Sequence, residues 1–553
     1  MVRSVCVIVG VALLGTAPAQ PSSSPDAGPQ APPSSPSSFA VGADCLACHN
    51  GLTTSSGEDV SIGATWQASM MAHSARDPYW QAAVRREILD HPERAAEIQQ
   101  ECAACHMPMA ARTGPVDVFA LLAEATADRT DRAALARDGV SCTVCHQIQP
   151  DGLGTDGTIN GRFHVAEGDD RPIFGPHAIE PGLARVMHSS SRFRPAEGRH
   201  VQSSALCASC HTLTTHALGA GGAVIGSLSE QMPYAEWQRS VYAQPAGGGA
   251  SAARSCQDCH MPAVAEPTQI ASVLGEPRPD LSRHTFVGAN AFMLRLLDRH
   301  RDALGVEAPS PALAEAARRT ERLLTTSTAT IAIAPVRFEG DTVIADVTVS
   351  NLAGHKLPTG YPSRRVWIEL TATDAAGRVL FSSGALSPDG RIAGNDADAS
   401  PTGIEPHHDE IARGEDVQIY EATMVDAAGV ATTGLLSGVR YGKDNRLLPR
   451  GFDPAGAPPE IAVQGVAAAD PTFTGGSDRV RYRIAGLGRT DRVGRGSFRL
   501  EAVLRYQPIA WRWARNLAAY DAPETQRFVG FYDAAAAESA TVLARANLAV
   551  DIN

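Results

Sequence analysis

Residues 45–49 read CLACH, and the same C-x-x-C-H spacing occurs four more times in the chain of 553 residues. The other copies are CAACH at 102–106, CTVCH at 142–146, CASCH at 207–211 and CQDCH at 256–260. At this composition, chance alone would produce roughly 0.007 copies in the whole chain. Five copies therefore indicate one chemical site repeated five times.

The cysteine count supports a covalent role for these motifs. Of 11 cysteines, Cys6 lies in the N-terminal segment and the other ten are all used by the motifs. Two thiols three positions apart can add to the two vinyl groups of one porphyrin, and the next residue, His, then reaches the iron. Zinc clips and structural disulfides, the alternatives, do not require His after every pair. We therefore predict five covalently attached haem c groups, held by Cys45, Cys48, Cys102, Cys105, Cys142, Cys145, Cys207, Cys210, Cys256 and Cys259, with His49, His106, His146, His211 and His260 as proximal iron ligands.

The sixth coordination position of each iron decides between an electron carrier and a catalyst. Seventeen histidines minus five leave twelve candidates, of which we predict five as distal ligands: His73, His188, His216, His284 and His355. His216 is too close to His211 in sequence to reach the far side of the same porphyrin, so we assign it to a neighbouring haem. The histidines held in reserve are His164 and His177, and those assigned to solvent are His91, His200, His300, His407 and His408.

An internal echo links two parts of the motif region. The stretch TWQASMMAHS at 65–74 recurs loosely as EWQRSVYAQP at 236–245, so Trp66 aligns with Trp237 and His73 aligns with Gln244. The second copy has lost the candidate ligand, and its haem needs a donor from elsewhere.

The N-terminal residues have the pattern of a targeting segment. Residues 1–19 carry one Arg, an apolar run and a small-residue cleavage site, which predicts a signal peptide and a periplasmic or extracellular protein. Residues 20–42 are rich in Pro and Ser and predict a disordered linker. No later segment is long and apolar enough to span a membrane. The formal charge of −12 argues against a nucleic-acid partner.

The periodicity of the chain changes after the motifs. We assign residues 43–305 to a pentahaem cytochrome c domain of short helices and many loops, and 306–327 to a bridging helix. From 328 to 553, apolar and polar residues alternate, which predicts a β-sandwich-like domain. The fold class is therefore α+β and multidomain. At least seven strands are predicted, within ATIAIAPVRF, TVIADVTVSN, VWIELTATD, RVLFSSG, VQIYEATMV, RVRYRIAG and FRLEAVLRYQ.

The motif region resembles the multihaem c-type cytochromes of the group that includes the tetrahaem electron acceptor of hydroxylamine oxidoreductase. The matching pieces are the W-x-x-S segment with His73, LCASCHTL at 206–213, CQDCHMP at 256–262 and SRHTFVGAN at 282–290. The stretch from Gly354 to Leu380 looks like the C-terminal part of larger exported relatives. The resemblance implies closely spaced, mostly bis-histidine haems that transfer electrons.

Two functions stay open on this reading. The first is an exported pentahaem electron carrier whose redox partners are other cytochromes or a membrane quinol oxidase module. The second is an oxidoreductase that acts on a small nitrogen or sulfur species at one five-coordinate haem. Enzymatic members of the resembling group often carry C-x-x-C-K, which is absent here. The strand-rich part could also dock the protein in an oligomer or filament.

Overall fold

The computed structural model describes residues 38–123, 131–243, 253–488 and 497–552, and these residues belong to one compact unit. The predicted signal peptide and most of the predicted linker lie outside the described residues. The last residues assigned to that linker are part of the core, because Phe39 is 4% exposed and Val41 is 5% exposed. No helix among the described residues is long and apolar enough to cross a membrane.

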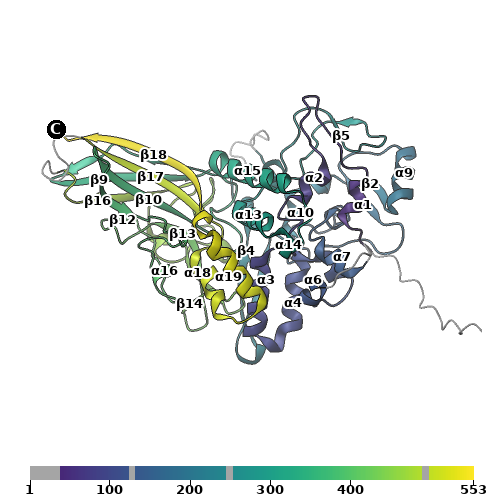
Figure 1. The fold of residues 1–553 in the computed structure, drawn as a ribbon, viewed down its shortest axis with the longest axis horizontal. Coiled ribbons are helices and arrows are strands. Elements are labelled where there is room, and N and C mark those ends of the chain that lie inside the picture. Colours follow the sequence, from purple (N-terminus) through teal and green to yellow (C-terminus); the bar gives the residue numbers. More distant parts are fainter. Residues whose placement is uncertain (1–37, 124–130, 244–252, 489–496, 553) are drawn as a thin grey trace, which may run out of the picture. The chain divides into compact units, whose positions relative to one another are not determined.

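The motif region consists of short helices joined by loops, as the sequence predicts (Figure 1). Its helices are α1 Gly42–Leu46, α2 Ile62–Gln67, α3 Pro78–Asp90, α4 Ala95–His106, α5 Pro108–Arg112, α6 Val118–Ala123, α7 Arg132–Arg137, α8 Cys142–Cys145, α9 Pro181–Ser191, α10 Ser204–Ala208, α11 Pro233–Gln238 and α12 Cys256–His260. Two-stranded sheets join β1 Pro172–Gly175 to β2 Arg194–Glu197, β3 Leu213–Leu218 to β4 Val224–Gln231, and β5 Thr268–Gln269 to β6 Pro277–Arg278.

Helix α3 shows why a long helix begins in this region. Pro78 occupies its first turn, where the missing N–H costs nothing, and the Asp77 carboxylate accepts from the N–H groups of Tyr79 and Trp80. Its Tyr79 side packs against Phe528 of α19, Pro523–Ala535, and the two helices lie side by side in Figure 1. The motif region and the strand-rich region therefore share a hydrophobic core.

Three helices follow the last motif: α13 Ala291–Arg299, α14 Arg301–Leu304 and α15 Ser310–Ser327. The Asn290 side chain accepts from Met293 N–H at the start of α13. The last helix lies within residues 306–327, the range assigned to a bridging helix, and Pro309 stands at its N-cap position.

The strand-rich region contains two packed sheets, which confirms the predicted sandwich. One sheet has the order β14-β13-β10-β17-β18, with β11 beside β10 and β15 beside β13, and the other has the order β12-β16-β9-β7, with β8 beside β9. Their buried faces meet in one core that includes Val347, Ile368 and Leu504. The bounds are β7 Ala329–Ile333, β8 Arg337–Glu339, β9 Thr342–Asn351, β10 Arg365–Asp374, β11 Val379–Ser383, β12 Glu410–Ile411, β13 Ile419–Val425, β14 Ala431–Thr432, β15 Arg440–Asp444, β16 Ser477–Ile484, β17 Ser497–Gln507 and β18 Thr541–Asp551.

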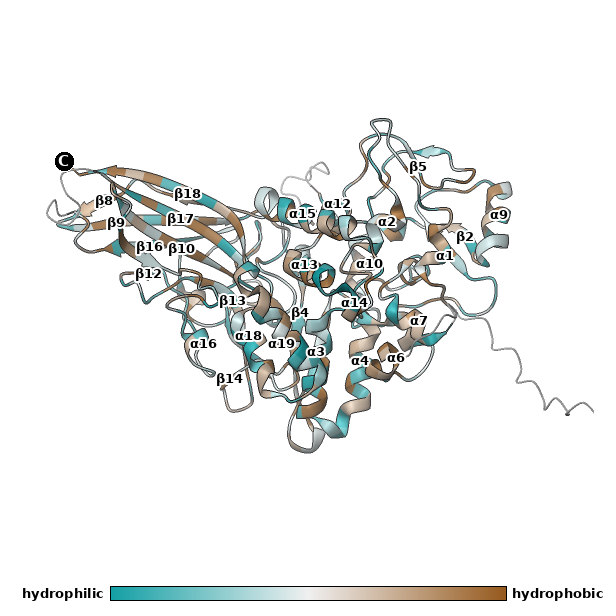
Figure 2. Ribbon diagram, viewed as in Figure 1, coloured by the Kyte–Doolittle hydropathy of each residue, from teal (hydrophilic) through white to brown (hydrophobic). Residues whose placement is uncertain are grey.

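All seven predicted strands are present, and β17 shows the alternation of hydropathy that predicted it (Figure 2). The prediction missed β18, which pairs with β17 from Thr541 to Asp551. It also missed three helices that cover the sandwich, namely α16 Asp396–Ala399, α18 Trp511–Asn516 and α19.

Candidate metal-binding array

Each of the five motifs lies on or beside a short helix, which sets the geometry of its two thiols. Cys142 begins α8, Cys256 begins α12, and Cys102 and Cys105 lie in the last turn of α4. Residues three positions apart on a helix face the same side, so both sulfurs of a motif can reach one flat group. None of the ten described cysteines forms a disulfide, which leaves every thiol available for a thioether bond.

Four of the five motif histidines each make the same kind of hydrogen bond. The Nδ1 atom donates to a backbone carbonyl oxygen at 2.5 to 3.0 Å, and the acceptors for His49, His106, His146 and His260 are those of Ile270, Ser74, Phe174 and Val287. Because a carbonyl only accepts, Nδ1 carries the proton and Nε2 keeps its lone pair. This is the arrangement in which proteins present imidazole to a metal ion.

Two predicted distal histidines face motif histidines across a gap of the right size. The ring centres of His146 and His284 are 6.2 Å apart with planes at 16°, and those of His260 and His355 are 6.3 Å apart with planes at 15°. A metal–imidazole bond of roughly 2 Å on each side, with about 1.1 Å from nitrogen to ring centre, gives about 6 Å. The Nδ1 atoms of His284 and His355 also donate to backbone carbonyls. The residues therefore fit two bis-histidine irons.

His73 has the burial and charge state expected of a metal ligand. It is 2% exposed, and neither ring nitrogen has a hydrogen-bond partner. Burial lowers its pKa to about 3, so the ring is neutral at physiological pH. A neutral imidazole with a free nitrogen is what iron requires, and a buried unpartnered ring is costly without such a role.

The structure does not bring His188 or His216 opposite a motif histidine. His188 lies on exposed α9 near Asp170, and His216 is exposed on β3. Both assignments stay predictions, as does the reserve role of exposed His164 and half-buried His177.

The prediction that five other histidines are solvated is wrong for most of them. His91 is 7% exposed and its Nε2 has no partner. His200 bonds through Nε2 to the Ile148 oxygen, and His300 stacks on Phe531 at 3.6 Å. His407 and His408 are also packed into the protein, because neighbouring side chains of the sandwich surround them.

The histidine of the second motif, His106, is stacked on a tryptophan. The Trp80 ring lies parallel to the His106 ring at 4.5 Å, with planes at 7°. This contact and the bond to Ser74 fix the imidazole plane while leaving Nε2 free. In the described part of the chain, His49, His106 and His211 have no imidazole in a ring pair with them.

The first segment of the internal echo, residues 65–74, makes two hydrogen bonds to the backbone just before a motif. Trp66 donates from Nε1 to the Val140 oxygen at 2.9 Å, and Val140 N–H donates to the Met71 oxygen at 3.0 Å. Val140 lies two residues before Cys142. We call this pair of bonds, with Trp66 and Met71 as the gripping residues, the first clasp.

The second member makes the same two bonds at the fifth motif. Trp237 donates from Nε1 to the Arg254 oxygen at 2.8 Å, and Arg254 N–H donates to the Tyr242 oxygen at 3.1 Å. Arg254 lies two residues before Cys256. The second clasp agrees with the alignment of Trp66 with Trp237: the first clasp holds the chain before the third motif and the second holds it before the fifth.

Thiols of different motifs lie close enough to shift one another's pKa. Three such pairs connect the first motif with the third, the second with the fourth and the fourth with the fifth: Cys45 with Cys142, Cys105 with Cys210, and Cys207 with Cys256. Backbone contacts support this packing, since Gly161 N–H donates to the Ser209 oxygen while a Cβ at Gly161 would lie 3.0 Å from that of Ala104. These pairs form two groups, one of the first and third motifs and one of the second, fourth and fifth. Cys145 of the third motif and Cys210 of the fourth pack against the same hydrophobic cluster, which joins the two groups into one array.

A buried acidic pair lies beside the second motif. Glu87 accepts from the N–H groups of Leu435 and Leu436, whereas Glu230 is 6% exposed and has only a 3.5 Å contact from Gln231. Burial, with the negative charge of Glu87, raises the pKa of Glu230 to about 8. Glu230 is therefore mostly protonated at neutral pH.

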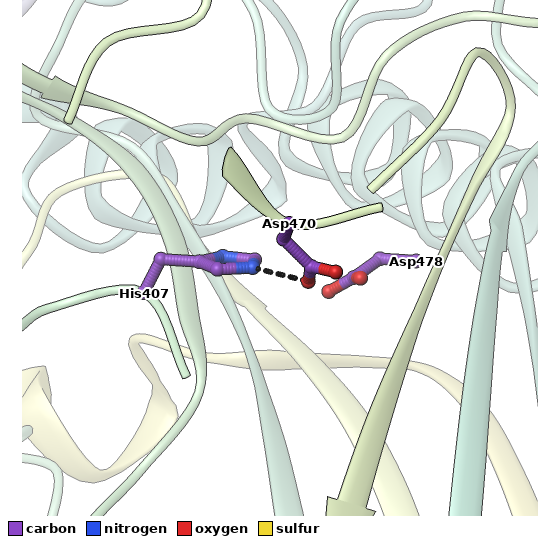
Figure 3. A group of neighbouring side chains, drawn as sticks. All are labelled: His407, Asp470 and Asp478. Atoms are coloured by element: carbon purple, nitrogen blue, oxygen red, sulfur yellow. Dashed lines mark hydrogen bonds and ion pairs between the residues drawn. The ribbon is translucent and has the colours of Figure 1, made fainter. Parts of the chain in front are cut away.

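A second cluster of possible ligands lies in the sandwich, outside the array. The ligand atoms of His407, Asp470 and Asp478 lie within 4.8 Å of one another, and His407 Nε2 is 3.0 Å from an Asp470 oxygen (Figure 3). One imidazole and two carboxylates form a ligand set that would suit a divalent cation.

The hydrogen-bond polarity around His407 opposes a metal there. Its Nδ1 accepts hydrogen bonds from the side-chain amide groups of Gln418 and Asn445, at 2.7 and 3.0 Å. Both amides are oriented by backbone N–H groups, those of His408 and Glu421, which donate to their oxygens. Nδ1 is therefore an acceptor, so Nε2 carries the proton and donates to Asp470. This is the opposite of the histidines in the array.

The sequence comparisons identify no relative. No protein-family model matches the chain, and no curated protein matches it in sequence.

The comparison of folds gives a clear neighbour. The chain is similar to the crystal structure of a penta-haem cytochrome c552 from Thermochromatium tepidum, with a TM-score of 0.50 and 16% sequence identity. The match covers 93% of this chain and 100% of that one. At this identity the likeness concerns the fold alone.

Proposed function

We propose that the protein is an exported pentahaem c-type cytochrome that passes electrons along closely spaced haems. The ten motif cysteines would hold the haems by thioether bonds, and the five motif histidines would bind the irons. Bound haem c supplies reversible one-electron iron chemistry. The protein supplies the spacing, the axial ligands and the burial that set the potentials.

The observation that carries this proposal is the adjacency of thiols from different motifs. A thiol that bonds a vinyl group defines an edge of its porphyrin, so adjacent thiols place neighbouring porphyrin edges together. The fourth motif has thiol pairs to the second and the fifth, which places it between these two in the array. The penta-haem neighbour of similar fold supports the same number of haems.

The axial ligands follow from the ring geometry. We assign the pairs His146 with His284 and His260 with His355 to two bis-histidine irons. Buried His73 is assigned as a distal ligand without a stated partner, and His188 and His216 remain candidates for the other irons. This ligand set agrees with membership in the group that includes the tetrahaem electron acceptor of hydroxylamine oxidoreductase.

Haem attachment bears on where the protein is located, and its net charge bears on its partners. Haem c is attached outside the cytoplasmic membrane, so we place the mature protein in the periplasm or outside the cell. The charge of −12 suits a basic redox protein or a small donor as partner, and does not suit nucleic acid.

Mass spectrometry and electron paramagnetic resonance of the purified holoprotein test the proposal. We expect about five extra haem masses and a ferric spectrum dominated by low-spin iron. Reduction by a small donor should reach all the haems. A mature chain without five haem masses would overturn the proposal.

One observation favours a second candidate, which is small-molecule chemistry at the second motif. Among the described residues no imidazole forms a ring pair with His106, which is instead stacked on Trp80, and the protonated Glu230 lies in the buried cluster near Cys102. A five-coordinate iron there could act on a small nitrogen or sulfur species. Carbon monoxide binding by the reduced protein at one molecule for each chain supports this candidate, and no binding removes it.

A further inference from the structure

The two clasps differ at the residue before tryptophan. In the first clasp segment this residue is Thr65, whose hydroxyl bonds only to the Ser61 and Ile62 oxygens of its own helix. In the second it is Glu236, which is fully buried at 0% exposure. A buried carboxylate needs partners, so its contacts identify what it holds.

Glu236 holds the loop that carries His355. Its Oε2 accepts from Lys356 N–H at 3.0 Å and from the Thr359 hydroxyl at 2.5 Å. Lys356 directly follows His355 in the chain, and Thr359 lies in the same loop. A residue of the motif region therefore binds the loop between β9 and β10 immediately beside its histidine.

The other side of the same loop rests on the second clasp itself. Tyr242 donates from its hydroxyl to the Leu352 oxygen at 3.0 Å. A Cβ at Gly354 would lie 3.2 Å from the Tyr242 ring and 3.3 Å from the Trp237 ring, so the backbone approaches both rings closely. The loop is held on both sides of His355.

The carboxylate belongs to a balanced buried network. Arg446 lies 3.0 Å from Glu236 Oε1, and Asp444 pairs with both Arg446 and Lys356 at 2.7 Å. All four side chains are at most 7% exposed, and their two positive and two negative charges cancel. Such a buried network is weak evidence for stability and is better explained by the geometry it specifies.

We propose that Glu236 is a positioning residue, whose carboxylate seats residues 352–359 on the second clasp so that His355 serves as the distal ligand of the fifth iron. This inference rests on the proposed function, because it requires His355 to bind iron. The second clasp segment carries Gln244 where the first carries His73, so it offers no imidazole of its own at that position. The strand-rich half supplies the ligand that the second segment lacks.

The test uses ferric holoprotein variants, with the spin state read by electron paramagnetic resonance and visible absorption. Glu236→Ala should convert up to one haem in five from low to high spin, and added imidazole should reverse the change. Glu236→Gln keeps an oxygen acceptor and should give a smaller change. Thr65→Ala, the matching position of the first clasp segment, should leave the spectrum unchanged.

Two further variants separate the possible failures. If His355→Ala leaves all five haems low-spin, the proposed ligand is wrong. If His355→Ala yields one high-spin haem but Glu236→Ala does not, the positioning role is overturned while the ligand stands. Should Glu236→Ala fail to fold, Thr359→Val removes one bond to the carboxylate. We then expect faster cyanide binding at one haem, and an unchanged rate overturns the inference.

Discussion

The rings of His146 and His284 face each other at 6.2 Å, and each donates its Nδ1 proton to a backbone carbonyl oxygen. Burial lowers the pKa of both rings, that of His284 to about 4, which keeps them neutral for metal binding. Each ring therefore has an unprotonated Nε2 that is available to a metal ion.

Removal of His284 should open one iron. We expect His284→Ala to convert one haem to the high-spin state and to raise its reduction potential, because loss of an imidazole donor favours ferrous iron. His300→Ala is the control, since His300 stacks on Phe531 outside the array. A low-spin spectrum in both variants would remove His284 from the ligand set.

Gly161 should limit how closely the second and fourth motifs approach. It has a φ of +71°, and a methyl group there would meet Ala104. Gly161→Ala should destabilise the protein by about 1–3 kcal/mol through crowding, in addition to backbone strain. Gly168→Ala carries the strain alone, since φ is +90° and no atom lies within 4 Å. Thermal unfolding of both variants measures the difference, and equal losses would contradict the crowding.

Glu230 should make the stability of the protein depend on pH. Its folded pKa of about 8 lies above the ordinary value of 4.5, so the folded state binds the proton more tightly than the unfolded state. The free energy of unfolding should therefore fall as pH rises from about 4.5 towards 8, by roughly 1.4 kcal/mol for each pH unit.

Glu230→Gln should flatten that dependence, because the amide does not titrate. Exposed Glu460→Gln is the control and should keep the slope. Denaturant titrations at pH 5 and pH 8 supply the comparison. The same slope in wild type and Glu230→Gln would show that other groups dominate.

The His407 cluster should not bind a metal. We expect zinc or calcium to leave Tm unchanged, and elemental analysis to find iron as the only stoichiometric metal, because Nε2 is protonated. A second metal that is lost in Asp470→Asn would show that the amides at Gln418 and Asn445 had reversed.

Local patterns explain what could be predicted of the fold. Strand β9 begins and ends where the alternation of TVIADVTVSN does, because one of its faces is buried throughout. Strand β18 was missed because its alanines, at 544, 546 and 549, give little strand signal. Pairing with β17 along its whole length decides its structure, and that pairing is not visible in the local sequence.

The site residues also divide into those that a local pattern predicts and those that depend on contacts between distant segments. The C-x-x-C-H motifs are visible because one porphyrin demands two thiols and an imidazole at fixed spacing. Distal ligands depend on contacts between distant segments, so only His284 and His355 of the five predicted face a motif histidine. The polar residues around His407 suggest exposure. It is buried because its partners Gln418 and Asn445 come from two distant places, the residue before strand β13 and the residue after β15.

The separation of His260 and His355 in the chain has a consequence for maturation. The first four motifs can be synthesised and exported before any residue of the sandwich exists. The fifth centre gains its second imidazole only when the loop after β9 has been placed by the folded strands. Binding of the second imidazole to the fifth iron would then indicate that the C-terminal half has folded. A chain truncated before residue 328 should mature with that iron accessible to external ligands.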